Sequence, residues 1–508
     1  MEERVPAVAM RNITKRFGPV VANDKCWLNI YRGEILAMLG ENGSGKTTLM
    51  NMLSGVYFPD EGTIAIDGKE VVISSPKDAF ALGIGMIHQH FKLVDVFTAA
   101  QNIVLGLPGK LDIADASKKI REICDRYGFV VDPDQKVYEM SVSQKQTVEI
   151  IKVLYRGADI LILDEPTAVL TPQETDKLFA VLRNMRDDGK AVVIITHKMH
   201  EVQDLSDRVA VLRKGHFTGD MLTKNTTVQE MTNMMVGRPV VLNIDRPEPD
   251  APKPRIEVKN LTVRDVDGIA KLDNVSFTAC SGEILGIAGI SGCGQKELLE
   301  AIAGLQPTEA GSITYIENDG KREELIGKDP LEIKNMGVAL SFVPEDRLGM
   351  GLVANMDLID NMMLRSYRQG PGLFTNRKPP NKLAHQMVDF LEIVTPSVET
   401  PVRRLSGGNV QKVLVGREIS NAPTVLLTAY ATRGLDINSS YTIYDLVTQQ
   451  KMRGVAVIYV GEDLDVLLEL CDKILVLCGG KVSGIVDGRK TSKREVGAMM
   501  TKLGGEQE

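Results

Sequence analysis

The sequence contains no apolar run of the length that crosses a membrane, and it has no excess of positive charge. Because a membrane-spanning helix needs about 18 uncharged apolar residues, we expect any role at a membrane to depend on partner proteins. The formal net charge of −7 offers no basic face, so we expect no nucleic-acid partner. Residues 1–4 include two glutamates and lack the apolar stretch of a signal peptide, and we therefore expect a cytosolic chain.

Cysteine is also sparse. The six cysteines are scattered along the chain, without the C-x-x-C pairs of metal sites, which is typical of reduced thiols rather than of a disulfide framework. They are Cys26, Cys124, Cys280, Cys293, Cys471 and Cys478. The chain is long: 508 residues are too many for one hydrophobic core and predict two or three domains.

One pattern occurs twice in the chain. The matched segments are 33–36 with 282–285, 141–143 with 406–408, and 161–163 with 426–428. Between the copies lies a stretch rich in proline, which predicts a semi-rigid linker at 239–255. The expected domains are therefore 1–238 and 256–508. Short β-branched runs such as 191–195 alternate with helical stretches, which predicts an α/β fold with a largely parallel sheet in each domain.

A phosphate-binding loop is predicted near the start of the first copy. An apolar strand at 35–39 leads into a glycine-rich turn and then a helix, an order in which backbone N–H groups and the helix dipole face an anion. Lys46 would reach the β- and γ-phosphates, and the Thr47 hydroxyl would bind Mg²⁺. The predicted ATP-binding residues of the loop are Gly40, Glu41, Asn42, Gly43, Ser44, Gly45, Lys46, Thr47 and Thr48.

An acidic pair follows the apolar strand at 160–163. Alone, such a pair is more often a solvated strand edge. Beside a phosphate loop, Asp164 suits Mg²⁺ coordination. Glu165 suits a general base that polarises the attacking water.

With these motifs the chain resembles the ABC ATPase superfamily over nearly its whole length. The resemblance implies a tandem duplication of a P-loop ABC ATPase domain, each copy with a helical subdomain. It identifies Gln89 with the residue that senses Mg²⁺, water and the permease, and His197 with the switch histidine on the γ-phosphate. Phe17 takes the place of the aromatic that stacks on adenine, although a core position is an equally good interpretation of that phenylalanine alone.

The second copy keeps the outline and changes the reactive positions. The replacements are Gln295 for Lys46, Lys296 for Thr47, Glu345 for Gln89, Ala429 for Asp164, Tyr430 for Glu165 and Glu462 for His197. Each lost catalytic group typically costs about 3–4 kcal/mol of transition-state stabilisation. The sequence therefore predicts that the second copy does not hydrolyse ATP.

The signature segments, residues 140–144 and 405–409, show the opposite pattern: the segment of the first copy has lost its glycines, and that of the second copy is nearly intact. In the ABC family, nucleotide is held between the phosphate loop of one domain and the LSGGQ-type signature of the other. The second copy keeps that signature, with ATP-binding residues predicted at Ser406, Gly407, Gly408, Asn409 and Gln411, and with Asp436 beyond it. The first copy has Val142, Ser143 and Thr171 at the matching places. The resemblance thus predicts one composite site, built from the first phosphate loop and the second signature.

Tandem chains of this kind resemble the ATPases of simple-sugar and nucleoside importers, and segments 87–94, 165–171 and 344–347 bring this one closest to the nucleoside-type branch. The resemblance implies two permease subunits, a solute-binding lipoprotein outside the membrane, and a peripheral place on the cytoplasmic face. Segment 91–105 is expected to contact the permease, unless its apolar residues pack in the domain core. The alternative is a soluble ribosome-associated tandem ATPase, which the negative charge and the short proline-rich linker disfavour.

Overall fold

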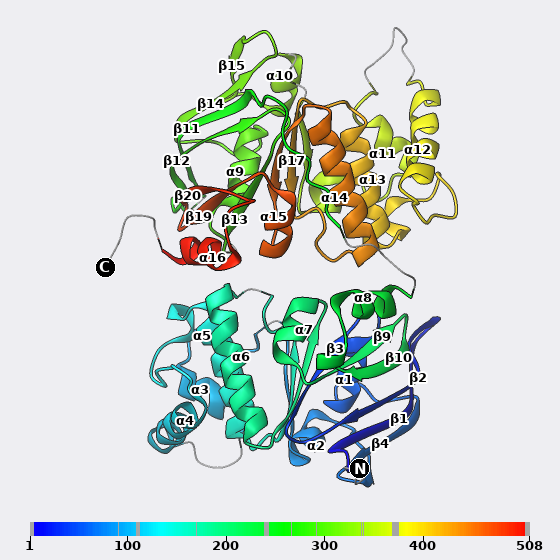
Figure 1. The fold of residues 1–508 in the computed structure, drawn as a ribbon, viewed down its shortest axis with the longest axis vertical. Coiled ribbons are helices and arrows are strands. Elements are labelled where there is room, and N and C mark those ends of the chain that lie inside the picture. Colours follow the sequence, from blue (N-terminus) through cyan, green and yellow to red (C-terminus); the bar gives the residue numbers. More distant parts are fainter. Residues whose placement is uncertain are drawn as a thin grey trace. The chain divides into compact units, whose positions relative to one another are not determined.

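The computed structural model describes residues 5–89, 91–107, 112–168, 170–237, 243–265, 267–290, 292–336, 338, 340–367 and 375–502. Within the segments discussed above, His90, Val169 and residues 238–242 lie outside the described part. The chain divides into two compact units, unit 1 (Met1–Val241) and unit 2 (Leu242–Glu508), and each is described by itself (Figure 1).

Unit 1 is built on a six-stranded sheet whose strands run in the order β10-β9-β3-β8-β7-β6. All neighbouring pairs are parallel except β9 with β10, which confirms the predicted α/β fold. The strands are β3 (Glu34–Leu39), β6 (Ile84–Ile87), β7 (Ile160–Asp164), β8 (Ala191–Thr196), β9 (Arg208–Arg213) and β10 (His216–Leu222). A second, antiparallel sheet has the order β2-β1-β4-β5. Its strands are β1 (Val8–Phe17), β2 (Val20–Ile30), β4 (Glu61–Ile66) and β5 (Lys69–Val71).

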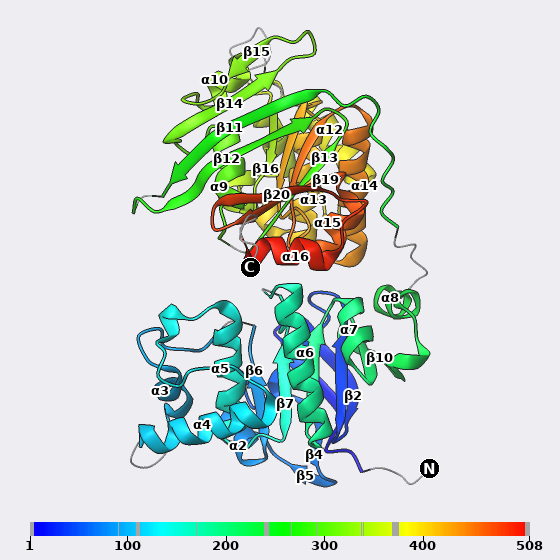
Figure 2. The same ribbon diagram turned by 60° about the vertical axis from the view of Figure 1, so that its left-hand side comes forward.

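Three of the helices of unit 1 form a group of their own. Helices α3, α4 and α5 pack on one another beside the β6 edge of the large sheet and form the expected helical subdomain (Figure 2). The helices are α1 (Lys46–Leu53), α2 (Pro76–Ala81), α3 (Ala99–Val104), α4 (Ile113–Tyr127), α5 (Val142–Tyr155), α6 (Pro172–Asp187), α7 (Met199–Leu205) and α8 (Val228–Val236). Short 3₁₀ turns lie at Val137–Glu139 and Thr223–Asn225. In neither unit does a helix of the described residues have the length and hydropathy to cross a bilayer.

Unit 2 repeats the topology strand for strand, with one sheet in the order β20-β19-β13-β18-β17-β16 and another in the order β12-β11-β14-β15. The strands of the first sheet are β13 (Ile284–Gly289), β16 (Leu340–Val343), β17 (Val425–Ala429), β18 (Ala456–Val460), β19 (Lys473–Cys478) and β20 (Lys481–Asp487). Those of the second are β11 (Pro254–Arg264), β12 (Ala270–Cys280), β14 (Ala310–Ile316) and β15 (Arg322–Glu324). The duplication predicted from the sequence is thus confirmed in the fold.

The helices of unit 2 follow the same plan. They are α9 (Gln295–Ile302), α10 (Pro330–Asn335), α11 (Leu358–Met363), α12 (Lys378–Phe390), α13 (Gly407–Ile419), α14 (Ile437–Met452), α15 (Leu464–Leu470) and α16 (Lys493–Thr501). A π-helical turn lies at Arg347–Gly351 and a 3₁₀ turn at Val402–Arg404. Helices α11 and α12 pack on α13 (Figure 1). Helix α13 also packs against β16.

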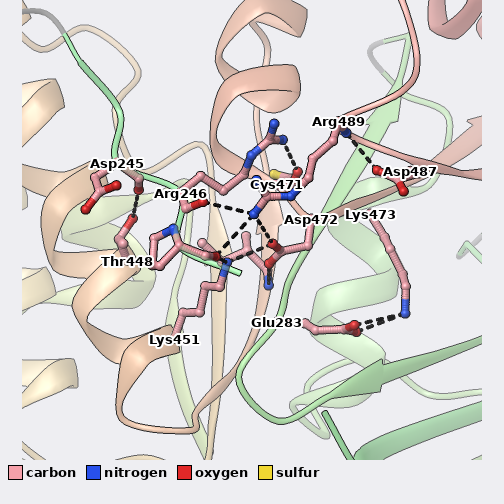
Figure 3. Close-up of polar contacts among 12 residues, drawn as sticks. Asp245, Arg246, Glu283, Thr448, Lys451, Cys471, Asp472, Lys473, Asp487 and Arg489 are labelled. Atoms are coloured by element: carbon pink, nitrogen blue, oxygen red, sulfur yellow. Dashed lines mark hydrogen bonds and ion pairs between the residues drawn. The ribbon is translucent and has the colours of Figure 1, made fainter. Parts of the chain in front are cut away.

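Part of the predicted linker is anchored on unit 2 (Figure 3). Arg246 Nη1 donates to the carbonyl of Cys471 at 2.7 Å. Lys451 Nζ donates to the carbonyl of Pro247 at 2.6 Å and pairs with Asp472 at 2.7 Å. Both members of this ion pair are buried, and a buried charge requires such a partner. The residues around Pro247 are therefore part of unit 2 rather than a free connection.

Candidate functional site

The phosphate loop of unit 1 joins β3 to α1, as predicted. Gly45 caps α1 with a φ of 96°, a left-handed conformation that glycine adopts at no steric cost. A Cβ at Gly45 would lie 2.4 Å from the carbonyl of Ala22, and one at Gly40 would lie 2.4 Å from that of Leu212. At Gly40 and Gly45 the turn is therefore packed too closely for a side chain, and a loop that leads into a helix start in this way presents N–H groups to an anion.

Lys46 lies inside this turn. Its Nζ donates to the carbonyls of Gly40 at 2.6 Å and Glu41 at 2.9 Å. Burial lowers the pKa of Lys46, and the negative charges of Glu165 and Asp164 oppose that effect. Ser44 Oγ is buried and has no hydrogen-bond partner among the described residues. Because buried polar atoms are nearly always paired, a buried cation and an unpaired hydroxyl in one turn suit an anionic ligand such as a phosphate.

Asn23 supports the loop from the neighbouring antiparallel sheet. Its side chain is fully buried on β2, and Nδ2 donates to the carbonyl of Gly45 at 3.2 Å. Gly215 also supports the loop, since its N–H donates to the carbonyl of Ser44 at 3.0 Å. Sequence reasoning missed both residues, because their contacts depend on strands distant in the chain. The exposed members of the loop are Asn42, Gly43 and Thr47, and Thr48 is half-buried.

Asp164 is the last residue of β7, as expected. Its Oδ1 accepts a hydrogen bond from Thr47 Oγ1 at 3.3 Å. Burial raises the pKa of Asp164, and the hydrogen bond from Thr47 opposes that rise. The structure thus brings together two of the three residues predicted to hold Mg²⁺; the third, Gln89, contacts Glu165 instead.

Glu165 is the centre of a three-residue cluster. Gln89 Nε2 donates to Glu165 Oε2 at 3.0 Å, and His197 Nδ1 lies 3.0 Å from Glu165 Oε1. The hydrogen bond with His197 is the main reason that the pKa of Glu165 lies below its ordinary value, although burial acts against it. The φ of Glu165 is 46°, and a non-glycine residue held there costs on the order of 1–3 kcal/mol. The three predicted catalytic residues therefore meet where β6, β7 and β8 end.

Phe17 lies at the end of β1 and is 42% exposed, so the core alternative considered for it is wrong. Its ring meets Tyr57 edge to face, with the ring centroids 5.2 Å apart. Tyr57 is 37% exposed. Sequence reasoning missed this second aromatic, which follows α1 and carries no motif. Together the two rings offer an apolar surface of the kind on which a base can stack.

Unit 2 keeps the backbone of this site and changes its side chains. Gly294 caps α9 with a φ of 96°, and the buried Gln295 donates through Nε2 to the carbonyl of Ile290 at 3.1 Å. Tyr430 has a φ of 51°, close to that of its counterpart Glu165. Burial raises the pKa of Tyr430 to about 12, so its phenol is neutral. No general base stands at this position of unit 2.

The signature of unit 2 opens α13. Ser406 caps the helix and accepts a hydrogen bond from Asn409 Nδ2 at 2.9 Å. A Cβ at Gly408 would meet Asp436 Oδ2 at 3.6 Å, an ordinary contact, and neither Gly407 nor Gly408 has a positive φ. Among the described residues of unit 2, nothing therefore requires glycine at position 408.

Two other predicted residues have clear places in unit 2. Asp436 caps α14 and accepts from the Ser439 N–H at 2.8 Å. Gln411 is 1% exposed, and its amide atoms have no partner among the described residues. In unit 1 the matching helix starts are closed differently, by capping boxes of Ser141 with Gln144 and of Thr171 with Glu174.

Comparisons with known proteins agree with this arrangement. A family model described as ABC transporter matches residues 24–168 and 272–430. The nucleoside import ATP-binding protein of Lactococcus lactis is 40% identical over 500 residues, which cover 97% of each chain. The guanosine import ATP-binding protein of Bacillus subtilis is 39% identical over 501 residues, again 97% of each. The glucose import ATP-binding protein of Haloferax volcanii is 38% identical over 537 residues, 98% of this chain and 96% of that protein.

Among solved structures, the archaeal ribosome recycling factor in complex with a ribosomal stalk protein is similar. The TM-score is 0.62 at 16% sequence identity, and the match covers 96% of this chain and 92% of that chain. At such an identity the likeness shows the fold alone.

Proposed function

The chain belongs to the ABC transporter family and is an ATPase, and we propose that it powers the import of nucleosides through partner proteins in a membrane. The observation that carries the chemical part of the proposal is the convergence of Gln89 and His197 on Glu165, beside the phosphate loop of Lys46.

The residues of unit 1 fit ATP. Lys46 and the loop N–H groups would hold the phosphates, and Ser44 Oγ is available to donate to a phosphate oxygen. Phe17 and Tyr57 are exposed aromatic rings on which adenine can stack.

The same site fits Mg²⁺. The Thr47 hydroxyl, the Asp164 carboxylate and the Gln89 amide provide the oxygen donors that Mg²⁺ prefers, and the first two are already 3.3 Å apart. When bound, the ion neutralises negative charge on the phosphates. We therefore assign Thr47, Asp164 and Gln89 to the metal.

Glu165 is proposed as the general base. A base must be ionised before it accepts a proton, and the contact with His197 lowers the pKa of Glu165 and so keeps it ionised. Gln89 and His197 also fix the direction of the carboxylate, because each contacts a different oxygen. Unit 2 has Tyr430 in place of this base, so we assign hydrolysis to the loop of unit 1 alone.

The signature of unit 2 is proposed to complete this catalytic site. Neither Gly407 nor Gly408 has a positive φ that would call for glycine, and a Cβ at Gly408 makes only an ordinary contact inside the unit. A requirement for glycine there would come from a ligand that approaches the start of α13, where N–H groups and the helix dipole favour an anion. This supports the assignment of Ser406, Gly408 and Asn409 to ATP.

The proposed partners are two permease subunits and an extracytoplasmic solute-binding lipoprotein, with this chain peripheral at the cytoplasmic face. Segment 91–105 is the proposed permease contact. Val94, Val96 and Leu105 are exposed in it, whereas Ala99 and Ile103 pack in the core. The exposed apolar residues support docking, and the buried residues show that part of the segment packs in the domain core.

The relatives named for nucleoside and guanosine import support nucleosides as the solute, and the glucose relative makes simple sugars the second candidate. The ribosome-associated alternative rests on a likeness of fold at 16% identity, which carries no function.

Uptake into liposomes tests the proposal. The chain is reconstituted with its permeases and lipoprotein, and radiolabelled guanosine, ribose and glucose are supplied with ATP inside or outside. We expect ATP-dependent accumulation of guanosine that a Glu165→Gln chain does not support. Accumulation of a sugar alone would contradict the nucleoside assignment, and no ATP-dependent uptake of any of the three would contradict import of these solutes.

A further inference from the structure

In unit 2, Arg433 connects the loops that follow three neighbouring strands. Strands β16, β17 and β18 are neighbours in the sheet, and the loops that follow them carry Glu345, Arg433 and Glu462 respectively. The guanidinium of Arg433 pairs with Glu345 and, through Nε at 3.1 Å, with Glu462. In unit 1 the same three loops meet at the carboxylate of Glu165. The central group is an anion in unit 1 and a cation in unit 2.

A second arginine continues this connection to the signature. Arg347 Nη2 donates to the carbonyl of Arg433, and Arg347 Nη1 donates to the carbonyl of Gly407 at 3.3 Å. Gly407 is the first residue of α13. Because the guanidinium is planar and its donors are fixed in a fork, Arg347 sets the distance between the Arg433 loop and the start of the signature helix.

The connection belongs to unit 2 alone among the described residues. Phe91 and Ala168 occupy the places of Arg347 and Arg433 in unit 1, and neither side chain can donate a hydrogen bond. The two arginines therefore occur in the copy whose signature keeps its glycines, and not in the copy whose signature has lost them.

We propose that Arg347 and Arg433 are positioning residues for ATP hydrolysis, which hold the start of α13 at a fixed place relative to the ends of β16, β17 and β18. The proposal rests on the proposed function, in which the signature of unit 2 completes the site of unit 1. The proposal gives a role to two residues of unit 2 that replace catalytic ones, Glu345 and Glu462. Together with Arg433, they hold the signature in place rather than act on a nucleotide.

A merely structural role makes a different prediction. The Arg433 side chain is 55% exposed, and its partners Glu345 and Glu462 are 36% and 47% exposed. Exposed ion pairs contribute about 0–1 kcal/mol to stability. Loss of Arg433 should therefore leave the unfolding temperature almost unchanged, so that an effect on turnover reports positioning rather than folding.

The test uses the full-length chain assembled with its permeases. We expect kcat for ATP hydrolysis to fall about tenfold in Arg347→Ala and in Arg433→Ala, because a small misplacement of a catalytic element is costly. The KM for ATP should change less than about twofold, since the phosphate loop of unit 1 is intact. Arg347→Lys should recover part of the loss, because one of the two carbonyls can still be reached. The matched control is Arg453→Ala, which removes an exposed arginine after the end of α14.

Two outcomes would overturn the positioning role. One is wild-type kcat in both alanine variants while Gly408→Val is inactive, which leaves the composite site standing. The other is a fall in kcat that parallels a fall in unfolding temperature and is not relieved in Arg347→Lys. A fully active Gly408→Val chain would instead contradict the proposed composite site itself.

Discussion

The two units share a backbone and differ in chemistry. Both phosphate loops end in a glycine with a φ of 96°, and both place a strained residue after the matching strand, Glu165 in one and Tyr430 in the other. The N–H groups of these two residues donate to the next strand at the same distance, 2.9 Å. The fold alone therefore does not make an ATPase site; a few side chains on that backbone do.

The reversal of charge at the centre of the site is the sharpest difference. In unit 1, Glu165 is held by two neutral or weakly basic side chains, Gln89 and His197, which leave its carboxylate able to take a proton. In unit 2, Arg433 is held by two carboxylates. An arginine between two glutamates has no proton to exchange near neutral pH, so this arrangement suits fixed geometry and not catalysis.

The largest difference between the two units is expected when the general base is replaced. Glu165→Gln should reduce ATP hydrolysis at least about a hundredfold, since general base catalysis is typically worth that much or more, while ATP still binds. Tyr430→Phe is the matched change in unit 2 and should leave the rate unchanged. ATPase rates and nucleotide retention of the assembled transporter provide the measurement. Comparable losses in the two variants would mean that both units carry out the reaction.

A smaller effect is expected at the matching positions of the two phosphate loops, Lys46 in unit 1 and Gln295 in unit 2. Lys46→Ala should weaken ATP binding about tenfold or more, because a hydrogen bond to a charged group is worth about 1.5–3 kcal/mol. Gln295→Met, which keeps the volume of this buried side chain, should not alter the affinity. Titration with a fluorescent ATP analogue checks both. Equal weakening by the two substitutions would show that the loop of unit 2 holds the measured nucleotide.

The smallest effect concerns the exposed aromatics. Tyr57→Ala should raise the KM for ATP several-fold, because a stacked aromatic contributes about 1 kcal/mol. The control in unit 2 is Leu305→Ala, an exposed apolar residue after α9. Steady-state ATPase assays across a range of ATP concentrations separate the two. An unchanged KM in Tyr57→Ala would remove Tyr57 from the adenine surface and leave Phe17 alone there.

The sequence predicted the parts of the site that follow local rules. A strand, a glycine turn and a helix gave the loop around Lys46, and an apolar strand that ends in Asp164 and Glu165 gave the acidic pair. The resemblance to a family supplied Gln89 and His197. All of these lie at strand ends of one sheet, where parallel strands bring their loops together.

The sequence could not predict contacts that depend on packing between distant elements. Asn23 reaches Gly45 from another sheet, and Arg246 reaches the carbonyl of Cys471 across unit 2. Arg433 and Arg347 lie in the second copy, of which the sequence predicted only the loss of the reactive residues. Their hydrogen bonds go to carbonyl groups and to glutamates. Segment 344–347 marked Arg347 only as part of a family resemblance, and no motif marked Arg433.

The composite site is the central claim, and one paired measurement tests it most directly. Gly408→Val and Ser143→Val introduce the same side chain at matched positions of the two signatures. A Cβ at Gly408 fits within its own unit, so Gly408→Val should fold normally, and the unfolding temperature of each variant verifies this. With the assembled transporter at saturating ATP, we expect Gly408→Val to lose hydrolysis and Ser143→Val to retain it. Loss of hydrolysis in Ser143→Val with full activity in Gly408→Val would contradict the account.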